Sequence, residues 1–129
     1  MLQDALPRLG VVQEVDVQLP HNRVRVPDIT VVEHPPEGHF VVDPPVLVVE
    51  ILSPSTRSED TVRKSAEYAA AGIGQFWVLD PEFGILDVFA NVDGGWETVA
   101  HLDHDHPTAT IAVGDHGSVD VDLTVVLAG

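Results

Sequence analysis

The sequence predicts a fold of the α/β (α+β) class: a mixed central β-sheet, one main helix after the third strand, and β-hairpins towards the C-terminal end. Three observations predict it. Apolar and polar residues alternate in the first third of the chain, the run 46–52 is almost wholly apolar, and a helical pattern follows that run directly. With 129 residues, 44% of them hydrophobic and 21% charged, we expect a single domain spanning residues 1–129.

The first two elements form a predicted hairpin. Residues 11–19 place valine and leucine on one face and acidic or amide side chains on the other, which is typical of a half-buried strand. Residues 24–32 are expected to pair back against them. Pro27 lacks an amide donor, so the second strand should lie at an edge or carry a bulge there. Residues 34–45, rich in proline and glycine, indicate a loop.

The central strand and the main helix come next. The apolar run 46–52 is short and rich in valine, so it indicates a strand covered on both faces. Thr56 and Glu59 have the spacing of a capping box, in which each residue satisfies a free amide at the start of a helix. The spacing predicts a helix over about 57–71, with Gly72 as its C-terminal stop.

The rest of the chain is expected to be strands. Residues 75–80 form another apolar strand. Residues 85–90 and 96–102 flank a turn that contains Asp-Gly-Gly and predict a β-hairpin. Residues 108–113 and 118–123 alternate in the same way and indicate a second pair. Phe76 and Trp77, in the strand 75–80, are expected in the core.

Composition narrows the classes of protein and of site. The chain has no cysteine, which excludes disulfides and thiolate metal sites. No apolar run approaches the roughly 18 residues that span a bilayer, and residues 1–10 lack the regions of a signal peptide, so we expect a soluble, cytoplasmic protein without a membrane partner. The net charge is −15, and all six cations except Arg8 lie between residues 23 and 64. The acidity has a simple alternative role, which is solubility.

Two carboxylates are candidate metal ligands. Glu50 interrupts the buried run 46–52, and a buried charge is rarely left without a partner. Asp28 follows Pro27 on the neighbouring predicted strand, so the two side chains can converge at one end of the sheet. Paired oxygen ligands with little else suit Mg²⁺. An aspartate after a proline is also a common turn residue, and this alternative stays open for Asp28.

The helix carries the only lysine, Lys64, and the helical period gives it an ambiguous place. The apolar stripe predicted at about 100° per residue consists of Val62, Ala66, Ala69 and Ala70. Lys64 lies on the opposite side with Asp60 and Tyr68. On spacing alone, Asp60 and Lys64 form a surface pair.

The segment "HLDHDH" (101–106) offers His101, His104 and His106 among acidic residues. A transition-metal site is conceivable. The position of the segment at the end of a predicted hairpin favours a solvated loop instead.

Two segments resemble a known family. They are "VPDITVV" (26–32) and "PPVLVVEILSPSTRSEDTVRKSAEYAAAGIGQFWVLDPE" (44–82). Together they resemble the Uma-two family of endonucleases, part of the PD-(D/E)xK, or restriction-endonuclease-like, superfamily. The resemblance covers roughly residues 11–127 and is most specific over 26–82. It implies a restriction-endonuclease-like sheet, and the family's N-terminal helix is shortened or missing here. Asp4 could replace the acidic residue which that helix often supplies.

The resemblance also implies a site. Asp28 matches the aspartate of the "PD" element and Glu50 the second acidic residue, so both would bind Mg²⁺, or Mn²⁺ as a substitute, with the carbonyl of Ile51 as a third ligand. The superfamily usually places a lysine two residues after the glutamate, where this chain has Leu52. Lys64 matches the lysine displaced onto the helix. Asp28, Glu50 and Lys64 would then be the catalytic residues.

Two functions of different classes follow. The first is a metal-dependent endonuclease that acts on DNA, with a homodimer placing two sites on one duplex. The second is a nuclease fold whose activity has lapsed and that serves as a binding or scaffold module. The net charge of −15 favours the second function, whereas the presence of Asp28, Glu50 and Lys64 together favours the first.

Overall fold

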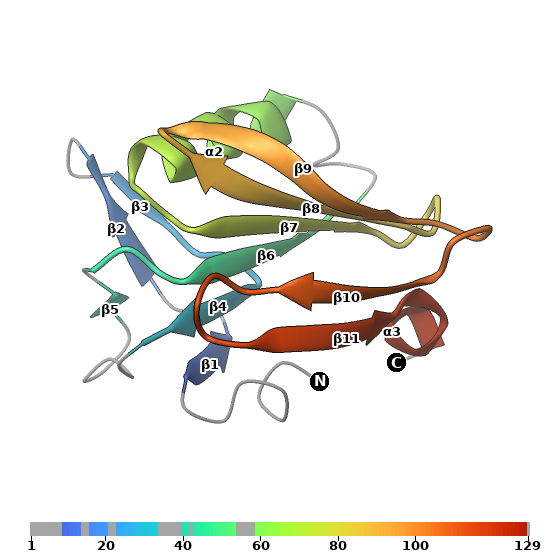
Figure 1. Cartoon of the computed structure of the whole chain (residues 1–129). Coiled ribbons are helices and arrows are strands. Elements are labelled where there is room, and N and C mark those ends of the chain that lie inside the picture. The colour runs from blue at the N-terminus through green and yellow to red at the C-terminus, as the bar shows by residue number, and fades with distance from the viewer. Residues whose placement is uncertain are drawn as a thin grey trace.

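The chain folds around a six-stranded mixed sheet (Figure 1). The computed structural model describes residues 9–13, 16–20, 23–33, 40–41, 43–53 and 59–128. In spatial order the sheet consists of β1 (Gly10–Gln13), β4 (Ile29–Val32), β6 (Leu47–Ile51), β7 (Gln75–Asp80), β8 (Ile85–Val92) and β9 (Gly95–Leu102). The predicted class, a mixed sheet with one main helix and C-terminal hairpins, is confirmed.

The predicted central strand is β6, which lies between β4 and β7. β6 and β7 run parallel and are joined by the helix α2 (Glu59–Ala70), while every other neighbouring pair in the sheet is antiparallel. The parallel pair requires a crossover connection, which α2 provides. The carboxyl ends of β6 and β7 therefore emerge at the same end of the sheet, as does the beginning of antiparallel β4.

The predicted hairpin of 11–19 with 24–32 exists, but it is divided between two sheets. Its outer half, β2 (Asp16–Leu19) with β3 (Arg23–Arg25), joins β5 (Phe40–Val41) in a three-stranded sheet, whereas β1 and β4 belong to the large sheet. Both halves keep the register of one hairpin. The second arm breaks between Arg25 and Ile29. Pro27, without an amide donor, lies in this break, and the predicted irregularity is thereby confirmed.

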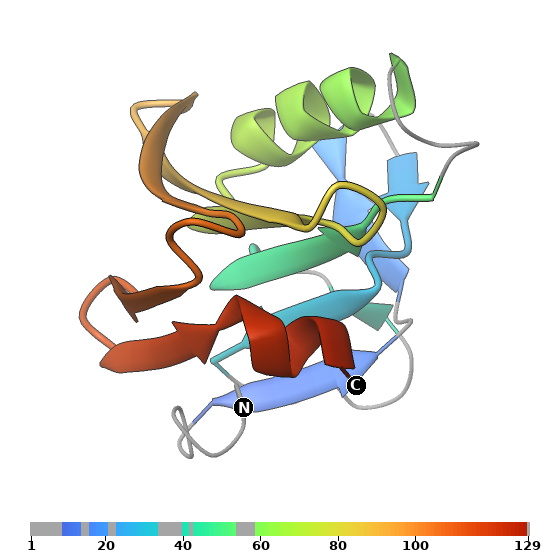
Figure 2. The ribbon, with the colours of Figure 1, turned by 90° about the vertical axis from the view of Figure 1, so that its right-hand side faces the viewer.

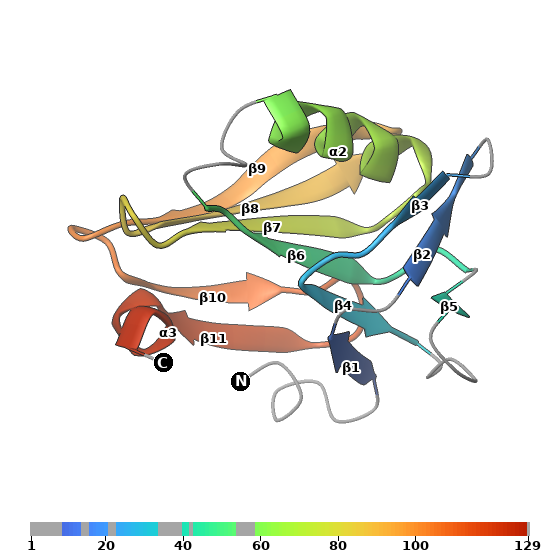
Figure 3. The same cartoon turned by 180° about the vertical axis from the view of Figure 1, so that it is seen from behind.

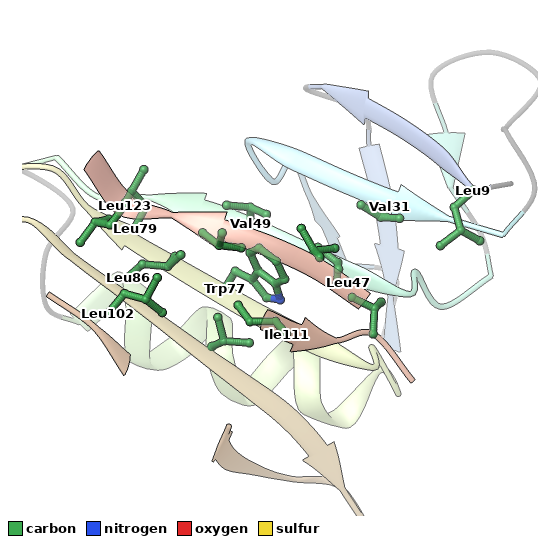
Figure 4. Close-up of a cluster of buried hydrophobic side chains, with 14 residues drawn as sticks. Leu9, Val31, Leu47, Val49, Trp77, Leu79, Leu86, Leu102, Ile111 and Leu123 are labelled. Atoms are coloured by element: carbon green, nitrogen blue, oxygen red, sulfur yellow. The ribbon is translucent and has the colours of Figure 1, made fainter. Parts of the chain in front are cut away.

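One face of the large sheet is covered by the C-terminal part of the chain (Figure 2). The covering elements are β10 (Thr108–Ala112), β11 (Ser118–Asp122) and α3 (Leu123–Ala128). Figure 4 shows Trp77 of the sheet at the centre of this first core, with Ile111 beside it. The Trp77 ring is 1% exposed and its Nε1 donates to the Gln75 side chain, so its one polar atom has a partner.

The opposite face of the sheet packs against α2 and the three-stranded sheet. Its core contains Tyr68 of the helix, Phe76 of β7 and Val48 of β6, each no more than 1% exposed. The rings of Tyr68 and Phe76 form a T-shaped pair with 5.4 Å between centroids. Both predicted aromatic core residues, Phe76 and Trp77, are therefore confirmed, one in each core.

Two glycines end or reverse elements where the sequence predicts it. Gly72, at φ 81°, follows α2, and the amides of Gly72 and Ile73 donate to the carbonyls of Ala69 and Tyr68, the two bonds of a Schellman cap. Between β8 and β9, Asp93 and Gly94 have φ 53° and 85°, the positive values that a two-residue hairpin of type I′ requires.

Two elements differ from the prediction, and two predicted features cannot be compared with the structure. The predicted loop 34–45 contains β5, and the predicted strand 118–123 ends at Asp122, after which α3 begins. Thr56 of the capping box and Asp4 in the N-terminal segment lie outside the described residues. In the described part of the chain, none of the helices has the length and apolar character needed to cross a membrane.

Candidate functional site

Glu50 projects from β6 towards α2. Side chains alternate along a strand, and Leu47 and Val49 of β6 pack in the first core while Val48 packs in the second, so Glu50 shares the side of Val48. Its side chain is only 8% exposed. The charge that interrupts the apolar run is thus placed between the sheet and the helix.

Two side chains of α2 reach the two oxygens of this carboxylate. The Tyr68 hydroxyl donates to Oε1 at 2.6 Å, and the Lys64 ammonium donates to Oε2 at 3.3 Å. Lys64 and Tyr68 are four residues apart, so they lie one above the other on the same face of the helix. A single carboxylate on β6 therefore has one donor on each oxygen, both from one turn of α2.

Burial dominates the protonation of this group. It raises the pKa of Glu50 above its ordinary value of 4.5, and the charge of Asp28 adds to this rise, while Tyr68 and Lys64 act in the opposite direction. Burial, with the neighbouring Glu50 charge, also raises the pKa of Tyr68 well above its ordinary value. The Tyr68 hydroxyl therefore keeps its proton and acts as a donor.

Asp28 lies at the bend between β3 and β4, directly before Ile29. Its Oδ2 accepts the backbone amide of Ile51 at 2.6 Å, so it fastens the last residue of β6. Because Ile29 pairs with Val49, the antiparallel ladder brings Asp28 alongside Glu50. The predicted convergence of Asp28 and Glu50 at one end of the sheet is what the geometry gives.

The helix α2 packs against the sheet with the face that the apolar period had predicted to be exposed. Val62 is 70% exposed, and Ala66 and Ala70 are exposed as well, so the predicted apolar stripe is wrong except at Ala69. The Lys64 and Tyr68 face is the one that meets the sheet. The physical reason is that Tyr68 buries far more surface than any alanine of the stripe, and Glu50 gives its hydroxyl a partner. The side chain of Asp60, the alternative partner of Lys64, lies outside the described residues.

Three contacts fix α2 around these two donors. Arg25 of β3 holds Glu67 through two bonds, Nε to Oε2 at 2.7 Å and Nη2 to Oε1 at 3.1 Å. The indole of Trp96 donates to the Ser65 carbonyl at 2.8 Å. The Asn91 side chain donates to the carbonyl of Ala69 in the last turn of the helix and to that of Ile73 just after it. Figure 3 shows β3 extending from the sheet towards α2, and the Arg25–Glu67 pair joins these two elements.

Sequence reasoning missed the roles of Tyr68 and of the Arg25–Glu67 pair. The sequence does contain a signal for Tyr68, since it follows Lys64 by four residues and both must share a helix face. Arg25 and Glu67 are 42 residues apart, and no local pattern joins them.

The donor set suits a hard divalent cation. Among the residues that the structure describes, no group of three or more histidine, cysteine, aspartate or glutamate side chains could hold a metal ion. Mg²⁺ takes one or two protein carboxylates and completes its shell with water and phosphate, so Asp28 and Glu50 fit it. The Lys64 ammonium on Glu50 also shows that this position already accommodates positive charge.

The histidines form a different environment. His104 and His106 are almost fully exposed, as the prediction of a solvated segment requires. His101 lies on β9, where its Nδ1 contacts Asp87 on β8, and hydrogen bonding and charge from Asp87 raise the pKa of His101. This pair joins two neighbouring strands. It lies in the same cross-strand row as Glu50 and is separated from it by β7, because Glu50 pairs with Val78 and Val78 pairs with Asp87.

Comparisons with known proteins bear on the family and the fold. A family model described as "Uma2: Putative restriction endonuclease" matches residues 1–115. One similar solved structure is described as a putative nuclease belonging to DUF820 from Anabaena variabilis ATCC 29413. The two share a TM-score of 0.78 and 19% sequence identity, over 98% of this chain and 74% of that one. A search of curated proteins found no match.

Proposed function

Because the chain belongs to the Uma2 family, we propose that it is an Mg²⁺-dependent endonuclease that hydrolyses phosphodiester bonds in DNA. The observation that carries the proposal is the position of Asp28 beside Glu50, together with the hydrogen bond that Lys64 donates to Glu50. Family membership supports the nuclease class. The choice of metal and of catalytic residues rests on the chemistry of these three side chains.

Asp28 and Glu50 would hold the metal, with Mn²⁺ as a substitute for Mg²⁺. The backbone of Ile51 supplies a third candidate ligand. Its amide points to Asp28, and in a strand the amide and carbonyl of one residue point to the same side. On that side the neighbouring arm carries Pro27, which has no amide to donate to this carbonyl.

When bound, the metal would lower the pKa of a coordinated water and offset charge on the phosphate. Glu50 needs a fixed orientation for this chemistry, and the Tyr68 hydroxyl provides it through Oε1. The Lys64 ammonium can donate to a phosphate oxygen or orient the attacking water, which stabilises charge that develops in the transition state. The packing of α2 over β6 keeps the Tyr68 hydroxyl and the Lys64 ammonium beside Glu50.

A plasmid-nicking assay tests the proposal. We expect wild-type protein to nick supercoiled DNA with Mg²⁺ or Mn²⁺ and to be inactive with EDTA. Asp28→Asn and Glu50→Gln should each lower the rate by at least about 100-fold, because each removes a charged ligand while keeping the side-chain shape. Glu97→Gln, which changes an exposed carboxylate on β9, is the matched control and should retain the wild-type rate.

Two outcomes would contradict the proposal. Metal-dependent cleavage that survives both Asp28→Asn and Glu50→Gln would show that the reaction occurs elsewhere. No cleavage of any DNA form, together with no rise of the melting temperature on adding Mg²⁺ or Mn²⁺, would favour a binding or scaffold module instead. The net charge of −15 is the feature of this chain that favours such a module.

A further inference from the structure

The two donors on Glu50 differ in how firmly they are held. Tyr68 donates at 2.6 Å from a residue that is 0% exposed and whose ring forms a T-shaped pair with Phe76. Lys64 donates at the longer distance of 3.3 Å, and its side chain is 21% exposed. The first contact belongs to the core, and the second lies at the border with solvent.

The backbone of α2 is fixed on both sides of Lys64's turn. Trp96 holds the carbonyl of Ser65, and Arg25 holds the side chain of Glu67 through two bonds. The helix therefore has little freedom to shift as a body. Lysine, by contrast, has a flexible four-carbon stem that lets its ammonium change partner without moving the backbone.

A metal on Glu50 would meet Lys64 at Oε2. Oε1 already accepts the short bond from Tyr68, so Oε2 is the oxygen at which a second positive group can be received with least rearrangement. A divalent ion and an ammonium that contact the same carboxylate oxygen would lie within a few ångströms of each other and would therefore repel each other.

We propose that Lys64 is a resident counter-cation for Glu50, which a divalent metal displaces on binding, while Tyr68 holds Glu50 in place during the exchange. The inference rests on the proposed function. It adds a coupling: the ammonium stabilises the buried carboxylate of the metal-free protein and is released towards the phosphate when the metal is bound. Lys64 is then available to the substrate only in the metal-loaded site.

The chain offers an unusually clean test, because Lys64 is its only lysine. Untagged protein without DNA is pulsed with an acetylating reagent at fixed pH, with and without Mg²⁺, and acetylation of Lys64 is measured by peptide mass spectrometry. The α-amino group serves as an internal control. In the wild type, saturating Mg²⁺ should raise the Lys64 labelling rate about threefold to fivefold, the range expected for loss of a modest ion pair.

Glu50→Gln provides the matched variant. Without the carboxylate charge, Lys64 should label at the faster rate from the start, and Mg²⁺ should leave that rate unchanged. Melting curves in the same buffers report whether Mg²⁺ binds. A raised melting temperature with unchanged Lys64 labelling would overturn the exchange and leave the proposed function intact. No change in melting temperature at high Mg²⁺ would overturn both.

Discussion

At the scale of single residues, the hydrogen bond from Tyr68 to Glu50 contributes both to the candidate site, by orienting Glu50, and to the stability of the fold. Glu50 is 6% exposed and Tyr68 is fully buried, so the hydrogen bond between the Tyr68 hydroxyl and Oε1 of Glu50 is shielded from water. A buried acceptor that loses its donor keeps the full penalty of desolvation. The hydroxyl of Tyr68 is therefore needed even when the protein does no catalysis.

Tyr68→Phe should lower the free energy of unfolding by about 1–3 kcal/mol, because it leaves Oε1 of Glu50 without a donor while keeping the ring that packs on Phe76. Urea denaturation at neutral pH measures this change. The control is a double-mutant cycle with Glu50→Leu. In the Glu50→Leu background, Tyr68→Phe should have little effect, because no carboxylate remains to be satisfied. An equal loss in both backgrounds would show that the hydroxyl acts on some other group.

The sequence indicated the acidic residues of the candidate site more clearly than the hydrogen-bond donors that contact Glu50. Glu50 was identifiable because a lone charge in an apolar strand demands a partner, and Asp28 because it follows Pro27 on a neighbouring strand. That Lys64 and Tyr68 both donate to Glu50 could not be predicted, since it depends on which face of the helix meets the sheet. Arg25 and Glu67 meet only in three dimensions.

At the scale of elements, α2 shows why a hydrophobic period can mislead. Alanines contribute little to burial, so a stripe made of Val62 and three alanines is a weak signal beside one tyrosine. The structure turns the tyrosine inward and leaves Val62 70% exposed. The inward face of the helix also carries the polar residues Lys64 and Glu67. They are tolerated because Lys64 pairs with Glu50 on β6 and Glu67 pairs with Arg25 on β3.

The missed helix α3 has a different cause. Its sequence, LTVVLA, is rich in β-branched residues and reads as the continuation of a strand. A helix-start signal was nonetheless present. Asp122 accepts both the amide and the hydroxyl of Thr124, as an N-cap residue does, and these bonds lower the pKa of Asp122.

Gly74, in the connection from α2 to β7, is predicted not to tolerate a larger residue. A Cβ at this position would lie 2.7 Å from the carbonyl oxygen of Val46, a backbone atom that cannot move aside cheaply. Gly74→Ala should therefore lower the free energy of unfolding by about 1–3 kcal/mol, as measured by chemical denaturation. Gly95→Ala is the matched control, since its Cβ would meet its nearest atom at 3.7 Å, and it should change stability by less than about 0.5 kcal/mol. Equal effects would contradict the steric account.

At the scale of the whole molecule, charge is distributed unevenly along the chain. Twenty-one acidic residues stand against six cations, and five of these cations lie between residues 23 and 64. In the fold, this segment supplies β3 and α2, which meet through Arg25 and Glu67. The cations of this segment whose side chains the structure describes, Arg25, Arg63 and Lys64, lie on β3 and α2, so we expect attraction for a nucleic-acid backbone there, against the repulsion of the acidic residues.

Binding of DNA should therefore depend only moderately on salt. With six cations in the whole chain, the slope of log K against log [KCl] should be no steeper than about −5.4, the limit for six phosphate contacts on a duplex. Fluorescence anisotropy with a labelled duplex at constant Ca²⁺ measures the slope. Arg63→Gln, which removes one exposed cation of α2, should reduce it by about 0.9. A steeper slope in the wild type would contradict binding by one chain and point to a second copy on the duplex.

The divided hairpin also sets a rule for anyone who redesigns this protein or compares it with variants of different length. Both halves share one register, so a residue deleted from the first arm between β1 and β2 would displace the pairing of one sheet relative to the other. A one-residue slip inverts every side chain of a strand. The two arms can therefore change length only together, and lengthening at the tip is the tolerated way to add sequence. Asp28, at the bend, is the residue that such a slip would misplace first.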